Sequence, residues 1–251
     1  MKGDMCNIKD NTMAVLKNWY SQATALDLSA DALYNDTLQR EFDVDANPRP
    51  ACTNLNQGQL GADAMTYDMQ ITARNMANYY RNLVATGWAK SKKGYAPTAK
   101  AMQALVYDCD NAGRDAQAQA DDCAATSYAS QIGLQLSFYK TGNYNLPKEE
   151  VLEQAMASWF GQLKNVDLDE RATYDSNVQS NAPDFANLLN EGASKVGCSV
   201  KTCLREGFSV AVCEFDGTTP AVGSALYTVG RTCSNCVAGK SCHKALPGLC
   251  A

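Results

Sequence analysis

Three observations predict an α+β fold for this chain of 251 residues. Apolar side chains recur at helical spacing through most of the sequence, and strand-like alternation begins only near residue 196. Helices followed by strands, rather than the two in alternation, are typical of α+β proteins. Seven of the eleven cysteines fall in the last 54 residues. This density predicts a disulfide-held C-terminal end and an oxidising compartment.

The first part of the chain is predicted to be an N-terminal helical extension over residues 1–51. Helical spacing there ends at the proline-containing stretch 47–50. The opening residues are polar and lack the apolar segment of a signal peptide, as expected for a mature secreted sequence with an added Met1. A sequon at Asn35 permits glycosylation in a eukaryotic secretory route.

The middle of the chain predicts three further helices. The first runs from Asp68 to a stop at Gly87, and the second opens after Pro97 and covers residues 98 to about 123. The third is expected over residues 148–164, where two glutamates in the first turn suit the positive end of the helix dipole. Each has an apolar face that could pack on a core.

Two strands are predicted at 197–203 and 208–215, joined by a hairpin turn. Residues 231–251 carry few apolar side chains, so disulfides are expected to hold them.

Charge and histidine content exclude several functions. A formal net charge of −5 argues against nucleic acid or an anionic membrane as the main partner. No apolar run is long enough to cross a bilayer. Lys90, Lys92 and Lys93 form a basic loop, interpreted as a solvated patch. The single histidine, His243, leaves few routes to catalysis or metal binding, so a binding protein is favoured over an enzyme.

Three stretches resemble the CAP superfamily of cysteine-rich secretory, antigen 5 and pathogenesis-related proteins. They are Met102–Cys109 with the alanine-rich segment after it, Leu152–Phe160, and Lys195–Phe215 with the Cys233-x-x-Cys236 tail. Within that superfamily the chain is most similar to the Ancylostoma-secreted, or venom-allergen-like, proteins of nematodes. The likeness covers roughly residues 52–251. It implies an α-β-α sandwich over residues 52–230 and a cysteine-rich hinge tail over 231–251.

The resemblance also implies how the cysteines pair. The expected disulfides are Cys123–Cys203, Cys198–Cys213, Cys233–Cys242 and Cys236–Cys250, which leaves Cys52 and Cys109 for a fifth. Cys6 is then a free thiol or an intermolecular bridge. Zinc bound by the tail cysteines and His243 is an alternative with acceptable ligands.

Many family members carry two histidines and two glutamates in a central cleft that can hold a divalent metal. The resemblance places these positions at Ser127, Leu134, Gln162 and Asp184. One carboxylate and an amide bind zinc poorly. We therefore expect no metal, no cofactor and no catalytic residue here, and interpret the cleft as a site for a neutral ligand.

Family members bind fatty acids between two long helices and sterols near an aromatic-bearing loop, so the resemblance implies possible lipid contacts here at Tyr79, Tyr80, Trp88, Trp159 and Phe160. The chain is thus predicted to be a secreted, non-enzymatic parasite effector or antigen, monomeric or dimeric. It would bind a host protein or a small hydrophobic ligand, with no nucleic acid and no integral membrane contact. The alternatives are a hydrolase or protease with an atypical cleft site, which loss of activity on substituting Asp184 or the tail residue His243 would support, and a purely structural secreted component.

Overall fold

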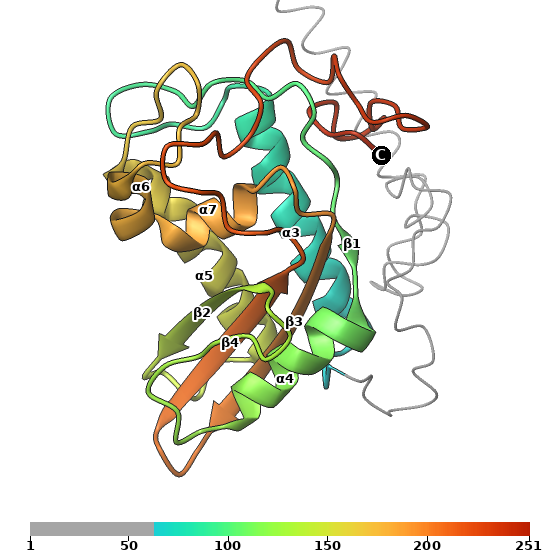
Figure 1. Cartoon of the computed structure of the whole chain (residues 1–251). Helices are drawn as coiled ribbons and strands as arrows, with labels where there is room; N and C mark the ends of the chain where they lie inside the picture. The colour runs from blue at the N-terminus through green and yellow to red at the C-terminus, as the bar shows by residue number, and fades with distance from the viewer. Residues whose placement is uncertain (1–62) are drawn as a thin grey trace, which may run out of the picture. The chain divides into compact units, whose positions relative to one another are not determined.

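The computed structural model describes residues 63–251 (Figure 1). In chain order the elements are α3 (Tyr67–Ala85), β1 (Val106–Tyr107), the π-helical turn η1 (Cys109–Gly113), α4 (Arg114–Asp121), β2 (Gln135–Thr141), α5 (Lys148–Gly161), the 3-10 turn η2 (Gln162–Asn165), α6 (Ser176–Asn181), α7 (Pro183–Leu189), β3 (Lys195–Cys203) and β4 (Phe208–Phe215). The predicted extension 1–51, with Cys6 and the sequon at Asn35, lies outside the described residues.

A four-stranded sheet with the order β1-β3-β4-β2 forms the centre. Strands β3 and β4 are the predicted hairpin, paired antiparallel from Val196↔Phe215 to Cys203↔Phe208. Strand β2 pairs antiparallel with the other side of β4, and the two-residue β1 pairs parallel with β3. The two predicted strands are confirmed, whereas β1 and β2 were missed.

The two faces of the sheet are covered by different helices, which confirms the α-β-α sandwich (Figure 1). Along β4, Val210 and Val212 pack with Ala116 and Ala120 of α4. The alternate residues Ala211, Cys213 and Phe215 belong to the larger core that α3, α5 and α7 build on the other face. Alternation along one strand therefore supplies both cores.

Helices α3 and α5 confirm two of the sequence predictions. Helix α3 begins at the N-cap Thr66, whose side chain accepts a hydrogen bond from the Met69 amide. It buries Met69, Ala73 and Ala77, which recur every three or four residues. Helix α5 follows Pro147 as predicted, and its last turn tightens into η2.

The predicted helix over 98–123 is wrong in its first half. Only η1 and α4 are helical there, and residues 98–105 run extended beside the C-terminal tail. Their backbone groups bond to other segments: the Cys250 amide donates to the Met102 carbonyl oxygen, and the Ala104 amide to that of Cys250. The buried residues Ala99, Met102 and Leu105 are three apart, which suits a helix but also a segment buried from two sides.

The four disulfides implied by the resemblance are present: Cys123–Cys203, Cys198–Cys213, Cys233–Cys242 and Cys236–Cys250. Cys109 is also disulfide-bonded, while its expected partner Cys52 lies outside the described part of the chain. The zinc alternative for the tail is wrong because its cysteines are consumed in these bonds.

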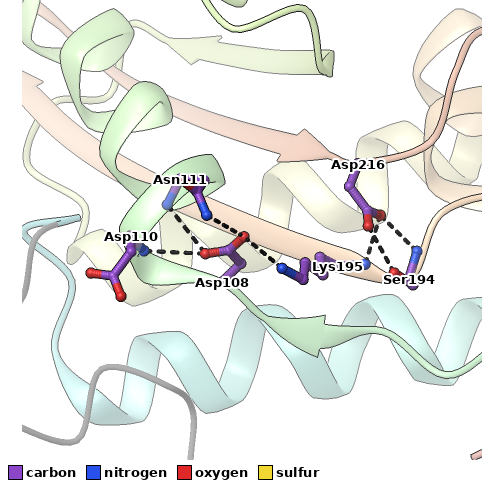
Figure 2. A network of polar contacts seen from close by, with 6 residues as sticks. All are labelled: Asp108, Asp110, Asn111, Ser194, Lys195 and Asp216. Atoms are coloured by element: carbon purple, nitrogen blue, oxygen red, sulfur yellow. Dashed lines mark hydrogen bonds and ion pairs between the residues drawn. The ribbon is translucent and has the colours of Figure 1, made fainter.

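A polar network fixes the edge where β3 begins, and Figure 2 shows Lys195 between two carboxylates. Asp108 caps η1 by accepting from the Asp110 and Asn111 amides, both at 3.2 Å, and lies 3.5 Å from Lys195 Nζ. On the other side, Asp216 accepts from the amides of Ser194 and Lys195 at 2.6 and 2.7 Å. The network ties η1 and the end of β4 to the start of β3.

Candidate functional site

Gln162 and Asp184, two of the four predicted cleft positions, contact each other directly. Gln162 lies at the start of η2 and Asp184 in the first turn of α7. Gln162 Nε2 donates to Asp184 Oδ2 at 2.7 Å. Gln162 Oε1 accepts from the amides of Asp184 and Phe185 at 3.0 and 3.1 Å. The Gln162 side chain thus caps α7, whose Ala182 provides no capping side chain.

Asp184 is a shielded carboxyl. Burial raises its pKa, while hydrogen bonds with Gln162 and Ser137 act in the opposite direction. Asn187, one turn later in α7, donates to Ser137 Oγ at 3.2 Å and to the Leu136 carbonyl oxygen at 3.0 Å. Helix α7 is therefore bound to η2 through Gln162 and to β2 through Asn187.

The other two predicted positions lie in the connection between α4 and β2. Ser127 is exposed. Leu134 is half-buried, and its amide donates to Ser130 Oγ at 3.0 Å. Neither side chain takes part in the hydrogen bonds that join Gln162 to Asp184.

The predicted lipid-contact aromatics separate into three groups. Tyr80 of α3 stacks on Phe160 of α5, with ring centroids 4.3 Å apart, and Tyr79 meets Tyr80 edge-on at 5.4 Å. Trp159 faces the core at 1% exposure and donates to the Phe138 carbonyl oxygen. Trp88 follows the end of α3, and its side chain is 72% exposed to solvent. Only the first group forms a shared surface between two helices, and we call Tyr79, Tyr80 and Phe160 the α3–α5 aromatic cluster.

A buried carboxyl pair on the α4 side of the sheet was missed. Ser130 Oγ lies 2.8 Å from Asp115 Oδ2 and 3.0 Å from Glu214 Oε2. Glu214 is fully buried, and burial together with the nearby Asp115 raises its pKa to about 8. The sequence could have indicated this pair, because Glu214 is a glutamate among the apolar residues of a buried strand.

A cavity and the single histidine are two further candidate features within residues 63–251. A cavity of about 460 Å³ opens between residues near Gln103, Glu191, Ser224 and Val237, a region that the sequence did not indicate. His243, one of the two residues named for the hydrolase alternative, caps a turn of the tail: its Nδ1 accepts from the Ala245 and Leu246 amides.

With this geometry in view, the comparison with known families is decisive. The sequence profile of the cysteine-rich secretory protein family, CAP, matches residues 74–215. The chain belongs to the CAP family.

Two curated relatives place this CAP protein more closely. Ancylostoma secreted protein of Ancylostoma caninum is 27% identical over 213 residues, covering 80% of this chain and 48% of the relative. Venom allergen-1 of Aedes albopictus is 27% identical over 211 residues, covering 80% of this chain and 78% of that protein. The chain thus spans about half the length of the Ancylostoma relative.

Solved structures show the same fold. The structure of NaASP2 with Zn²⁺ superimposes with a TM-score of 0.67 at 26% identity, covering 74% of this chain and 97% of that one. The structure of Na-ASP-1 superimposes with a TM-score of 0.68 at 26% identity, covering 80% of this chain and 49% of that one. These matches confirm the recognition of the family and the fold class.

The residues at the predicted tetrad positions of this CAP protein do not fit a zinc ion. Ser127, Leu134 and Gln162 offer a hydroxyl, a hydrocarbon and an amide, where zinc prefers imidazole, thiolate or carboxylate. The remaining carboxylate, Asp184, is already bonded to Gln162, whose amide oxygen is occupied by two backbone amides.

Proposed function

We propose that this CAP protein is a secreted, non-enzymatic effector that binds a host protein or a lipid. CAP proteins are in general not classical enzymes, and homologues of this chain are secreted. Within residues 63–251, no helix combines the length and hydrophobicity that crossing a bilayer requires.

The bond between Gln162 and Asp184 carries this proposal. A catalytic or metal-binding cleft needs side chains whose lone pairs or protons face the ligand. Here the amide and the carboxyl satisfy each other, and the amide oxygen caps α7. Side chains in this arrangement support the start of a helix and leave recognition to the surrounding surface.

The α3–α5 aromatic cluster supports a hydrophobic ligand as the first class to test. Tyr79 is 53% exposed, although it contacts Tyr80, which stacks on Phe160. The half-buried Met76 lies three and four residues before Tyr79 and Tyr80 on α3 and packs against the same core. Its side chain adapts to irregular ligands. A sterol ring or an acyl chain placed against Tyr79 would gain apolar contact without displacing a charged group.

A titration of the oxidised, full-length protein with a sterol and a fatty acid tests the proposal. We expect saturable binding that Tyr79→Ala and Phe160→Ala weaken about tenfold, because an aromatic contact is lost in each variant. Tyr144→Ala is the matched control, since Tyr144 is 41% exposed on the loop before α5. Thermal unfolding separates lost binding from lost folding in Phe160→Ala, whose ring packs against the core.

The outcomes distinguish the ligand classes. If neither lipid binds, the lipid part of the proposal fails, and capture of one defined partner from host plasma would support the protein-binding part. Hydrolysis of a peptide or ester substrate that disappears in Asp184→Asn would overturn the non-enzymatic assignment.

A further inference from the structure

Residues 88–96 form a short hairpin between α3 and the extended segment that leads to β1. Lys90 and Tyr95 pair as an antiparallel bridge. The turn is closed by a hydrogen bond from the Ser91 amide to the Gly94 carbonyl oxygen at 3.0 Å. The hairpin is therefore an ordered element with two distinct faces.

Side chains alternate between the faces of such a hairpin. Ala89 and Ala96 point inward, where they are 1% and 3% exposed. By the same alternation, Trp88 and Lys90 on one strand and Tyr95 on the other share the outer face. Trp88 is 72% exposed and Tyr95 56%, so two large aromatic side chains stand in solvent on one small surface.

Three lysines surround these aromatics. Lys90, Lys92 and Lys93 are all exposed. None of them forms an ion pair within residues 63–251. We call Trp88, Tyr95 and the three lysines the Trp88 surface.

Two acids of the neighbouring loop after η2, Asp167 and Asp169, accept hydrogen bonds from backbone amides and hydroxyl groups rather than from the lysine ammonium groups. Asp167 accepts from the Lys93 amide at 2.7 Å and from Ser91 Oγ at 3.1 Å. Asp169 accepts from the amide and hydroxyl of Thr173 at 2.7 and 2.8 Å. The Asp167 bonds hold the hairpin on the loop. Neither Asp167 nor Asp169 forms an ion pair with a hairpin lysine within residues 63–251.

We propose that the Trp88 surface docks this protein on the surface of an anionic phospholipid bilayer. Tryptophan and tyrosine partition to the headgroup level, because each has an apolar body and a polar group. Lysines beside them attract an anionic leaflet. An aromatic signal and a basic signal together give peripheral binding, which needs no membrane-spanning helix.

The net charge of −5, which argued against an anionic membrane as the main partner when the whole chain was considered, is less important for docking through one small surface. Exposed charges farther than a Debye length, about 8 Å at physiological ionic strength, are largely screened. The leaflet therefore responds to the lysines of the hairpin rather than to the sum over the chain. Docking is also independent of ligand uptake at the α3–α5 aromatic cluster, which involves different side chains.

Co-sedimentation of the full chain with vesicles tests the proposal. We expect binding to phosphatidylcholine vesicles containing about one third phosphatidylserine, and much weaker binding without phosphatidylserine. Trp88→Ala should weaken binding about tenfold. The triple change of Lys90, Lys92 and Lys93 to glutamine should weaken it about a hundredfold, at about fivefold per lysine, and high salt should weaken the wild type in the same way.

Matched variants control for exposure and charge. Leu204→Ala removes another apolar side chain that is 72% exposed, at the β3–β4 turn. The triple variant Lys148→Gln, Arg205→Gln and Lys244→Gln removes three positive charges at other positions of the chain. Both should bind vesicles like the wild type, and the melting temperatures of all the variants should agree.

Three results would overturn the proposal: no binding to either vesicle, binding unchanged in the hairpin variants, or equal loss in the control variants. Retention on immobilised heparin that depends on the lysines but not on Trp88, without vesicle binding, would instead assign the hairpin to a sulfated glycan and also overturn it.

Discussion

Arg81 shows how one charged side chain can organise a junction inside the core. It is fully buried in α3. Its Nε donates to the Gln103 carbonyl oxygen at 3.0 Å, and Nη1 donates to those of Leu188 and Asn190, both at 2.9 Å. A further bond reaches the Ala193 carbonyl oxygen at 3.2 Å. Burial lowers the pKa of Arg81 to about 9, so the guanidinium remains charged at neutral pH.

We predict that Arg81→Met lowers the free energy of unfolding by about 3–5 kcal/mol, because the buried carbonyl oxygens lose their donor. Arg81→Lys should also destabilise, since one ammonium cannot reproduce the planar fork. Arg205→Met, at an exposed position of the β3–β4 turn, is the control. Urea unfolding measures the differences; a loss below about 1 kcal/mol for Arg81→Met would contradict this role.

The raised pKa of Glu214 predicts how the stability of the fold depends on pH. Its pKa is about 8 in the folded protein, against an ordinary value of 4.5. Between these values folding takes up a proton, so stability should fall as pH rises, by about 1.4 kcal/mol per pH unit. Glu214→Gln, neutral at every pH, should remove this contribution, and its advantage over the wild type should grow from pH 5 to pH 8.

Thermal unfolding across this pH range measures the effect. Glu206→Gln, at an exposed glutamate of the β3–β4 turn, should follow the wild type. If Glu214→Gln and the wild type keep a constant difference at every pH, Glu214 is not protonated on folding.

At the scale of elements, the approach of η1 to β3 depends on a missing side chain. A Cβ atom at Gly197 would lie 2.1 Å from the Gly113 amide nitrogen and 2.5 Å from the Asp108 carbonyl oxygen. Both neighbours are backbone atoms that cannot rotate away. Any larger residue must therefore separate the π-helical turn from the strand.

We predict that Gly197→Ala costs about 3 kcal/mol or more, although alanine is otherwise tolerated in strands. Gly142→Ala is the matched control, because a Cβ there meets nothing within 4 Å. Chemical denaturation compares the two; equal stability would mean that η1 moves away from β3 without cost.

The elements differ in how far the sequence predicts them. Helices α3 and α5 follow from local spacing and start signals. Strand β2 was missed because its residues are half polar: Ser137 and Tyr139 serve polar contacts with α7 and α5. The extended segment 98–105 could not be predicted locally, since its backbone partners, such as Cys250, are far along the chain.

The candidate site shows the same division. The residue types at the positions that the resemblance gave predict a cleft without the metal ligands of the family, and this stays a prediction. The resemblance also implied the four disulfides that the structure contains. The hydrogen bond between Gln162 and Asp184 and the outward face of the hairpin at Trp88 depend on orientation, which spacing cannot give. The function of this protein is therefore better inferred from the geometry of its surface side chains than from its fold.

At the scale of the molecule, the disulfides close loops of very different length. Cys123–Cys203 joins residues 80 apart and connects the segment just after α4 to the last residue of β3, whereas Cys233–Cys242 joins residues 9 apart within the tail. In the chain-entropy view, a longer closed loop restricts the unfolded chain more, giving about 4–5 kcal/mol for the first bond and about 2–3 kcal/mol for the second.

We therefore predict that Cys123→Ala with Cys203→Ala lowers the melting temperature more than Cys233→Ala with Cys242→Ala. The second bond lies in a tail with a small apolar content, so its loss should open residues 231–251 locally before the sandwich unfolds. Calorimetry measures the first effect, and amide hydrogen exchange across the tail and its partner segment 98–104 measures the second. Equal losses of melting temperature, or tail exchange that accelerates only together with the core, would mean that the hinge tail and the sandwich unfold as one unit.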